Sequence, residues 1–419
     1  MKEMVSPLVQ NWVGPHLPQE HIFVPPEKKP TNANDVARLY FRKWLIHPLK
    51  RHLTHSYSEA LAAIGCEIIG ITGSAGKTTV KELIASVLSQ KFNTVYTPAN
   101  IDPIYNIPTT VLKTPLNTQK LILEMGIEYP GEMDFYLWLA KPKTGVVTTI
   151  YYTHTQFLGS LDNVKREKGK LIESLPKNGY AILNYDDRNV RDLAKVTDAE
   201  VVWYGTDSKA DIRATDIEFT DDLKTKFILK LGSEAEEITL NLFGQQFVPL
   251  ALAAAAVGHL DGIEIKKIKH GLEKVGRQPH RMIPIKLENG TTIIDDSYNA
   301  NPLATKEALR VLGNIGKGRR KIFIFAEMKE LGQYEEKSHR EVGAFAAETG
   351  VNITFGLGEL TRFTLKEIDK RRRGSKTIFS ESKKELIELV KKTVRPGDVI
   401  LVKGSRSMAM EEVVDCLAK

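Results

Sequence analysis

Cysteine is scarce in this sequence, and long apolar runs are absent from it. Two cysteines occur in 419 residues, Cys66 and Cys416, far apart and in no C-x-x-C spacing. That spacing excludes a disulfide framework and a cysteine-based zinc site, and it favours a reducing, cytoplasmic compartment. No apolar run reaches the roughly eighteen residues that a spanning helix needs, and no signal-peptide pattern is found.

Aromatic residues make up 8% of the chain and do not interleave with a basic stripe, so no nucleic-acid partner is expected. The net charge of +7 suits anionic substrates, and lysine and arginine are spread along the chain. The run Arg371 to Arg373 is interpreted as a solvated surface feature. An apolar fraction of 42% over 419 residues indicates a globular protein of two or three domains. We expect it to act as a monomer on small molecules.

Residues 1–64 predict an atypical N-terminal segment. The first 33 or so are rich in proline and predict an extended arm or loop. Asp35 to Leu53 predicts a basic helix that is interrupted by Pro48. This helix could lie on an anionic membrane surface. Packing of its Leu, Tyr, Phe and Trp side chains on the next domain is favoured instead, so membrane contact is not expected.

From residue 65 onward, short apolar runs alternate with helical patterns, which predicts an α/β fold. Residues 65–278 are expected to form a central P-loop mononucleotide-binding domain with a mostly parallel sheet. A boundary is placed in the stretch Gly276 to Arg281. Residues 279–419 are then expected to form a C-terminal Rossmann-like α/β domain.

A glycine-rich stretch, GITGSAGKTT, follows the first apolar run and precedes a helical pattern. Strand, turn and helix N-terminus bring backbone N–H groups to one point, where they can hold phosphate. Lys77 can reach the outer phosphates, and the Thr78 hydroxyl can bind Mg²⁺. The general P-loop pattern has glycine where Ile71 stands, and a tight turn without a ligand is the alternative. The loop residues expected to bind nucleotide are Gly73, Ser74, Ala75, Gly76, Lys77, Thr78 and Thr79.

Three further polar residues of the central part are candidates for metal chemistry. Glu124 follows an apolar strand in LILEMG, where a carboxylate can complete a Mg²⁺ shell. His154 follows the next strand, and Lys168 belongs to a helical stretch of alternating charge. Each has a plain alternative: a surface glutamate, a structural histidine and a solvated lysine.

The C-terminal part has polar residues after two predicted strands. In IIDDSYNANP, Asp296 could accept hydrogen bonds from a ribose, or the Asp and Asn residues could cap the next helix. In GDVILVKGSR, Lys and Arg could bind a carboxylate or phosphate. The expected substrate-binding residues are Asn299, Asn301, Lys403, Ser405 and Arg406.

Several of these motifs occur together and in order in a known family. The stretches are GITGSAGKTTVKEL, LILEMG, HTQFLGSLDNVKREKGK, AILNYDD, IIDDSYNANP, EMKELG and GDVILVKGSR. With them the chain resembles the Mur ligases, the ATP-dependent peptide-bond-forming enzymes of peptidoglycan synthesis. DDSYNANP and VKGSR match its D-alanyl-D-alanine-adding branch. The resemblance runs from about residue 68 to 415.

The resemblance implies a role for each matching residue. Lys77 and the loop amides hold ATP phosphates, and Thr78 with Glu124 binds a first Mg²⁺. His154 helps to hold a second Mg²⁺, which is supported by a carbamylated lysine at Lys168. Catalytic roles thus fall to Lys77, His154 and Lys168. From the C-terminal domain, Arg281 reaches the phosphates and Asp296 binds the ribose.

The chain departs from the family pattern in three places. The small sheet and glycine loops of the sugar-nucleotide-binding domain are missing before residue 65. After Pro98 the branch usually reads G-N-x-N-N, whereas this chain has Ala99 to Pro103. The H-N-x-x-N near the adenine is replaced by Gln246 to Leu250.

The implied activity is amide-bond formation between a carboxylate donor, activated as an acyl phosphate, and an amino-acid or dipeptide amine. The donor expected from the resemblance is a UDP-muramoyl peptide and the acceptor D-alanyl-D-alanine. The departures keep two alternatives open. One is a ligase for another peptide or polyglutamate-type substrate, and the other is a nucleotide-binding homologue without catalysis.

Overall fold

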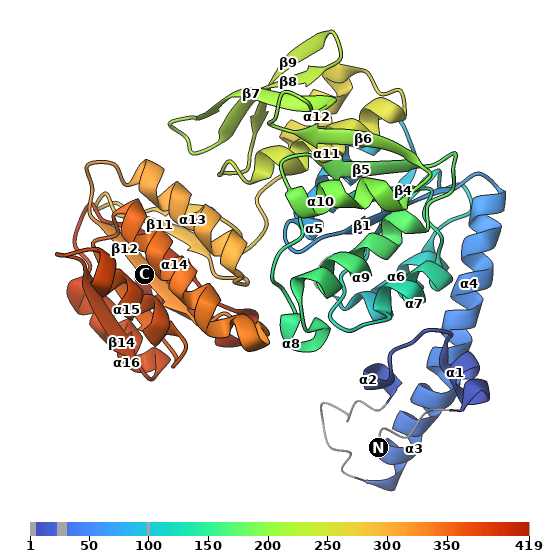
Figure 1. Ribbon diagram of the computed structural model, residues 1–419, viewed down its shortest axis with the longest axis horizontal. Helices are drawn as coiled ribbons and strands as arrows, with labels where there is room; N and C mark the ends of the chain where they lie inside the picture. Colours follow the sequence, from blue (N-terminus) through green and yellow to red (C-terminus); the bar gives the residue numbers. More distant parts are fainter. Residues whose placement is uncertain (1–5, 23–31, 99–100, 419) are drawn as a thin grey trace.

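Figure 1 shows a computed structural model of the chain, which describes residues 6–22, 32–98 and 101–418. The chain folds into two sheets, each covered by helices on both faces, and into a helical segment that precedes them. The α/β fold expected from the alternation of apolar runs and helical patterns is confirmed. The first sheet has nine strands and the second has six.

The nine-stranded sheet has the order β2-β3-β1-β4-β5-β6-β7-β8-β9. Its strands from β2 to β7 are parallel, and β8 and β9 pair antiparallel. The bounds are β1 (Glu67–Thr72), β2 (Thr94–Tyr96), β3 (Lys120–Glu124), β4 (Thr144–Val147), β5 (Tyr180–Asn184), β6 (Glu200–Gly205), β7 (Ile212–Phe219), β8 (Thr225–Leu231) and β9 (Glu234–Leu240).

Successive residues of the parallel strands enter two different cores. Ile69 and Ile71 pack on the face covered by α5 (Lys77–Leu88), α11 (Phe247–Leu260) and α12 (Ile265–Lys274). Ile68, Leu121 and Leu123 pack on the opposite face. That face is covered by α4 (His47–Ala63), α6 (Pro103–Lys113), α7 (Glu132–Leu139) and α9 (Leu161–Glu173). Burial on both faces explains why these strands are continuous apolar runs.

The antiparallel ribbon β7 to β9 was not foreseen. Along β8, buried and half-buried residues alternate, as is typical of a strand with one wet face. Such strands lack the uniform apolar character by which the parallel strands were recognised.

The six-stranded sheet has the order β10-β11-β15-β12-β13-β14, parallel except for β10. Its strands are β10 (Ile283–Lys286), β11 (Thr292–Asp296), β12 (Lys321–Ala326), β13 (Ile353–Leu357), β14 (Lys376–Ser380) and β15 (Val399–Lys403). One face carries α13 (Pro302–Ile315), α14 (Glu335–Thr349) and α15 (Thr361–Arg371). The other carries α16 (Lys383–Thr393) and α17 (Glu411–Ala418). The expected domain boundary falls in the connection between α12 and β10.

The expectation of an extended N-terminal arm is wrong for the residues that the structure describes. Two short helices lie there, α1 (Pro7–Val13) and α2 (Gln19–Ile22). The Ser6 hydroxyl accepts a hydrogen bond from the Val9 N–H and caps α1. Pro7 occupies the first helical turn, where its missing N–H costs nothing, so proline here starts a helix. Residues 1–5 and 23–31 of the expected arm lie outside the described residues.

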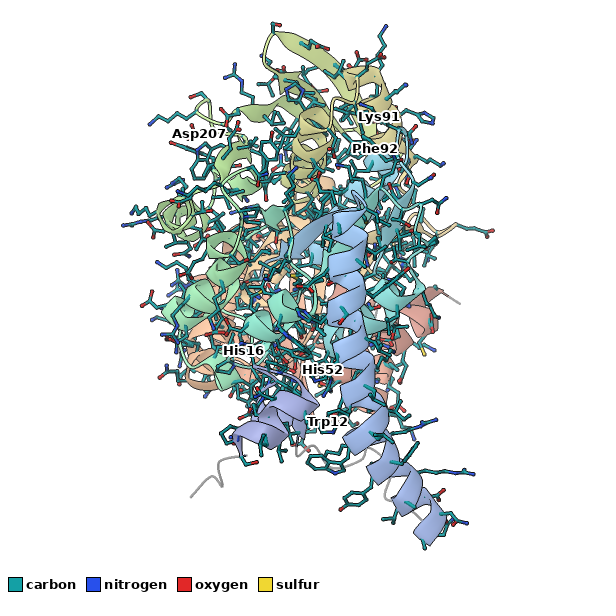
Figure 2. All side chains as sticks on the ribbon, turned by 90° about the vertical axis from the view of Figure 1, so that its right-hand side faces the viewer. Trp12, His16, His52, Lys91, Phe92 and Asp207 are labelled. Carbon is teal, nitrogen blue, oxygen red and sulfur yellow. The ribbon has the colours of Figure 1, made fainter. Side chains whose placement is uncertain are left out.

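The expected interruption at Pro48 is also wrong. Helix α3 (Ala33–Phe41), a π-helical turn (Arg42–Ile46) and α4 follow one another as one long helix, visible in Figure 2. Proline removes the N–H that would bond the Trp44 carbonyl. The Trp12 indole N–H, on α1, donates to that carbonyl instead at 2.7 Å.

Trp44 packs against the neighbouring core, as expected, but the other side chains that attach this helix differ from those expected. Pro48, Arg51 and Leu61 are buried, whereas Tyr40, Phe41 and Leu53 are exposed. The Arg51 guanidinium donates to the Val13 carbonyl at 2.6 Å, so a buried arginine joins α4 to α1. Among the described helices, none combines the length and apolar content that crossing a bilayer requires.

Candidate functional site

The phosphate loop connects β1 to α5, as predicted. Gly73 has a φ of +146°, and a Cβ atom there would lie 1.9 Å from the Thr148 hydroxyl. Gly76 has a φ of +81°, and its Cβ would lie 2.8 Å from Leu250. Both positions therefore require glycine for backbone conformation and for space.

The loop is fastened to the segment after β4. The Ser74 N–H donates to the Thr149 carbonyl at 2.7 Å, and the Tyr151 N–H donates to the Ser74 hydroxyl at 2.9 Å. The Thr148 hydroxyl donates to the Ala75 carbonyl at 2.6 Å. These bonds hold the loop against the end of the neighbouring strand.

Lys77 and Thr78 begin α5 beside Glu124. The Thr78 hydroxyl lies 3.1 Å from Glu124 Oε1, because Glu124 ends β3 and Thr78 starts the helix that follows the neighbouring parallel strand β1. Lys77 Nζ donates to the Gly73 carbonyl at 2.9 Å, and burial lowers its pKa while the Glu124 carboxylate opposes that shift. A hydroxyl and a carboxylate side by side form an oxygen donor set that suits Mg²⁺.

Lys81 was not foreseen as part of this site. Its side chain is fully buried one turn after Lys77, and Nζ lies 3.3 Å from Glu124 Oε2. Nζ makes no hydrogen bond to a residue that the structure describes. The sequence signal that could have indicated Lys81 as part of the site was its place in the helix, one turn beyond the loop lysine.

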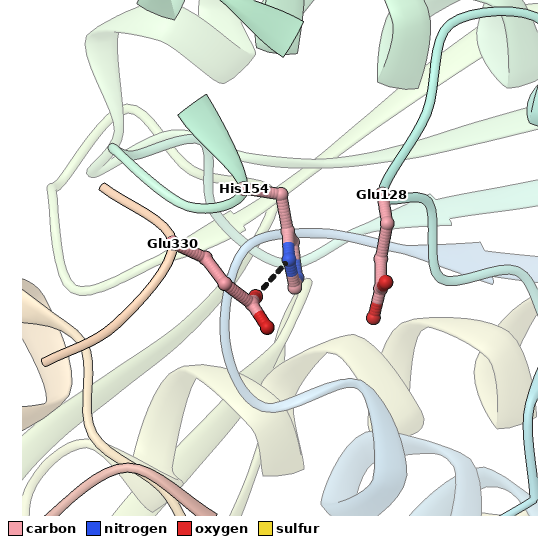
Figure 3. Close-up of side chains that lie close together, drawn as sticks. All are labelled: Glu128, His154 and Glu330. Carbon is pink, nitrogen blue, oxygen red and sulfur yellow. Dashed lines mark hydrogen bonds and ion pairs between the residues drawn. The ribbon is translucent and has the colours of Figure 1, made fainter. Parts of the chain in front are cut away.

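His154 lies between two carboxylates, as Figure 3 shows. Its Nδ1 is 2.7 Å from Glu330 Oε2, and Glu128 faces it from the other side. One ligand atom from each of these three residues lies within 4.8 Å of the others. The hydrogen bond from His154 lowers the pKa of Glu330. Neither glutamate was predicted, because they come from different parts of the chain.

Lys168 is buried in α9, and the charge of Glu128 from this cluster acts on it. Burial lowers its pKa well below the usual range, and the positive charge of Lys77 lowers it further. The interpretation as a solvated lysine is therefore wrong. A lowered pKa favours the uncharged amine, and an uncharged amine can act as a nucleophile.

At the second sheet, Asp296 and Lys403 end two neighbouring parallel strands and form a buried ion pair. Burial raises the pKa of Asp296, and Lys403 opposes the rise. Lys403 Nζ also donates to the Asn299 carbonyl at 3.0 Å, and the Arg406 N–H donates to Asn299 Oδ1 at 3.3 Å. The structure thus brings together four of the residues predicted for nucleotide and substrate.

Two other predicted residues hold the backbone. Asn301 caps α13, with Oδ1 accepting from the Ala304 N–H at 2.8 Å, which is the capping alternative considered for this motif. The Ser405 hydroxyl accepts from the Lys329 N–H at 2.8 Å and so joins the end of β15 to the loop after β12.

A cavity of about 700 Å³ lies between the two sheets. One wall consists of Arg281, Tyr298 and Arg406, with the Arg281 guanidinium 4.2 Å and that of Arg406 5.5 Å from the centre of the Tyr298 ring. The other wall is α5, including Glu82 and Ser86. Two arginines beside an aromatic ring make this cavity suitable for an anionic, planar ligand.

The segment Gln246 to Leu250, which departs from the family pattern, opens α11 beside the loop. Phe247, Val248 and Leu250 are buried, and Leu250 lies against Gly76. Gln246 Oε1 is buried and accepts no hydrogen bond from the described residues. The Gln246 side chain lies against Gly244, and an unpaired buried acceptor fits a hydrogen-bond donor on a bound ligand. In the other altered segment, residues 99–100 lie outside the described residues, and Asp102 caps α6.

Comparison with known proteins accounts for these features. Residues 71–258 match the Mur ligase middle domain, and residues 280–406 match the Mur ligase, glutamate ligase domain. The UDP-N-acetylmuramoyl-tripeptide--D-alanyl-D-alanine ligase of Escherichia coli (strain K12) is 33% identical over 84% of this chain and 77% of its own. That of Bacillus subtilis (strain 168) is 33% identical over 84% and 76%.

Among solved structures, MurF from Acinetobacter baumannii superposes with a TM-score of 0.79 and 25% identity, over 88% of this chain and 80% of its own. Both sheets, the phosphate loop and the two matched domains therefore agree with one family. The chain belongs to the Mur ligases, a family of ATP-dependent peptide ligases.

Proposed function

We propose that the protein adds D-alanyl-D-alanine to a UDP-N-acetylmuramoyl-tripeptide in the cytoplasm, with conversion of ATP to ADP. The observation that carries the proposal is the phosphate loop with Lys77, Thr78 and Glu124 in place. It occurs in a chain that matches two such ligases over both domains. A cytoplasmic location agrees with two cysteines that are both free.

The chemistry requires activation of a carboxylate. An amine does not displace oxide from a carboxylate, but phosphate leaves readily from an acyl phosphate. The donor carboxylate would attack the γ-phosphorus of ATP, and the amine of the acceptor would then attack the acyl carbon and release phosphate. Lys77 and the amides of the loop would neutralise charge on the phosphates during the transfer.

Two Mg²⁺ ions accompany this chemistry in the proposal. Thr78 and Glu124 would hold the first, since their oxygens already lie 3.1 Å apart. His154 would help to hold the second. The bound ions would supply positive charge at the phosphoryl group. Asp296 would hold the ribose of the nucleotide, and Arg281 its phosphates.

We further propose that Lys168 is carbamylated. The amine must be uncharged to attack CO₂, and burial together with Lys77 lowers its pKa in that direction. The attack would release one proton, and the resulting carbamate would be an anion in place of the neutral amine. Carbon-13 NMR in ¹³C-labelled bicarbonate should show a carbamate resonance in the wild type and none in Lys168→Ala.

The acceptor would bind at the second sheet, beside Lys403, Asn299 and Arg406. Arg406 is exposed and offers a cation to a peptide carboxylate, while buried Lys403 holds the Asn299 carbonyl beside it. Ser405 and Asn301 support it by fixing the loops on either side.

A different donor is the second candidate function, and a particular observation favours it. In the described part of the chain before β1, every element is helical. A ligase for another peptide or polyglutamate-type donor would therefore keep the chemistry and change the substrate. Calorimetry with UDP-muramoyl tripeptide separates the two, since only the first candidate binds it.

Release of ADP tests the proposed function. The wild type should form ADP at a rate that requires both UDP-muramoyl tripeptide and D-alanyl-D-alanine. Lys77→Ala should lose at least about a hundredfold in rate, because a phosphate-neutralising charge is removed. ADP release that ignores both substrates would contradict the proposal, and so would its absence with every acceptor tried.

A further inference from the structure

The cluster Glu128, His154 and Glu330 joins the two halves of the molecule. Glu128 follows β3, His154 follows β4, and Glu330 follows β12 of the second sheet. The ligand set is mixed, with one imidazole and two carboxylates. Mg²⁺ and divalent metals of the first transition row, such as Mn²⁺, accept such a set.

Hydrogen bonds between the loop around Glu330 and the segment around His154 hold these residues in position. The Gln156 N–H donates to the Glu330 carbonyl at 3.1 Å, and the Thr155 hydroxyl donates to the Leu331 carbonyl at 2.8 Å. Gln333 donates to the Gly159 carbonyl at 3.0 Å. The loop that carries Glu330 is thus docked on the segment that carries His154.

The charges in the cluster are not balanced. Two carboxylates face one imidazole, and only Glu330 bonds to that ring. The two carboxyl groups face the imidazole from opposite sides, and ionised carboxylates this close together repel each other. A divalent cation placed among the three ligand atoms would balance that charge.

We propose that a divalent cation binds Glu128, His154 and Glu330 and thereby holds the second sheet against the first. The inference rests on the proposed function in so far as His154 is the expected ligand of the second cation. It adds that Glu330 supplies a ligand from the C-terminal half, so that binding of the metal and docking of the two halves are one event.

The first test uses the full chain without nucleotide or substrate, titrated with Mn²⁺ and followed by electron paramagnetic resonance of the free ion. The wild type should bind one ion, and Glu330→Gln and Glu128→Gln should each weaken that binding by about tenfold or more. Glu336→Gln is the matched control, since Glu336 lies nearby on α14 and pairs only with Arg340 in the contacts observed.

The second test measures docking. Mn²⁺ should slow hydrogen exchange at the Gln156 amide in the wild type and in Glu336→Gln, but not in Glu330→Gln. A wild type that binds no Mn²⁺ at millimolar concentrations overturns the proposal, as does a Glu330→Gln chain with wild-type affinity. Neither test uses ATP or donor, so the two proposals can fail separately. A chain that binds no Mn²⁺ but still joins donor and acceptor overturns the metal site and leaves the proposed function standing.

Discussion

Gln246 belongs to the segment that departs from the Mur ligase pattern, so the resemblance does not explain its position. Its Oε1 is buried against Gly244 and unpaired among the described residues. If the exocyclic amine of adenine donates to it, Gln246→Leu should weaken ATP binding by about tenfold, the equivalent of one hydrogen bond. Binding of inosine triphosphate, which has no such amine, should be unchanged. Calorimetry of both nucleotides checks this, and an equal loss for both would contradict it.

A second prediction at the scale of single residues concerns Lys403 and the free energy of unfolding. Removal of its charge leaves Asp296 buried and unpaired, so Lys403→Met should lower the free energy of unfolding by about 3–5 kcal/mol. Urea denaturation measures this. In Asp296→Asn/Lys403→Met the loss should be much smaller, because no buried charge remains. A double variant as unstable as the single one would show that the ion pair is not the cause.

Much of the phosphate site could be predicted at this scale. Thr78 and Glu124 meet because β1 and β3 are parallel neighbours whose carboxyl ends coincide. The cluster around His154 could not be predicted. Glu128 lies outside the quoted motifs, Glu330 lies in EMKELG but had no role assigned to it, and their approach depends on how two separate sheets dock. Lys81 was missed because a lysine in a helix is usually solvated, whereas this one is fully buried.

At the scale of elements, the loop before α14 depends on the protonation of His339. Its Nδ1–H donates to the Glu335 carbonyl, and Nε2 accepts from the Met328 N–H. The neutral ring satisfies both bonds, and burial lowers the pKa of His339. The unfolded chain then binds a proton that the folded chain does not, so the free energy of unfolding decreases as pH falls below about 6.5.

Urea denaturation at several pH values checks the role of His339. As pH falls, the wild type should lose stability from about pH 6.5 down to the lower pKa that His339 has in the folded chain. His339→Gln should be less stable at neutral pH and should lose part of this pH dependence. An unchanged pH profile in that variant would assign the effect to another group.

The long N-terminal helix depends on a bond that replaces the one lost at Pro48. Trp12→Phe keeps an aromatic ring next to His52 and removes the N–H that donates to the Trp44 carbonyl. The free energy of unfolding should fall by about 1 kcal/mol. Trp12→Phe in a Pro48→Ala background should cost less, since alanine restores a backbone donor. Equal costs in both backgrounds would mean that the indole bond does not compensate for proline.

At the scale of elements, uniform burial made the parallel strands easy to predict. The ribbon β7 to β9 and the helices before β1 could not be predicted in the same way. Proline at the first turn of α1 and proline after a π-helical turn are both compatible with helix, although proline usually ends one. Local context at the ends of helices decided these cases.

At the scale of the whole molecule, the candidate site is divided between two sheets. The phosphate loop, Glu124 and Lys168 belong to the first, and Asp296, Lys403 and Arg406 belong to the second. The cavity of about 700 Å³ between them is lined by residues from both. Ligation therefore depends on how the two halves dock. The alternation of apolar runs with helical patterns and the motifs could not predict that docking.

The central claim is that a donor carboxylate is activated by ATP and then joined to D-alanyl-D-alanine. The most direct test labels the terminal carboxylate of UDP-muramoyl tripeptide with ¹⁸O and follows the label by mass spectrometry. We predict one ¹⁸O atom in the inorganic phosphate for each peptide bond formed. Phosphate without ¹⁸O, while ATP is consumed and the peptide is formed, would contradict the account.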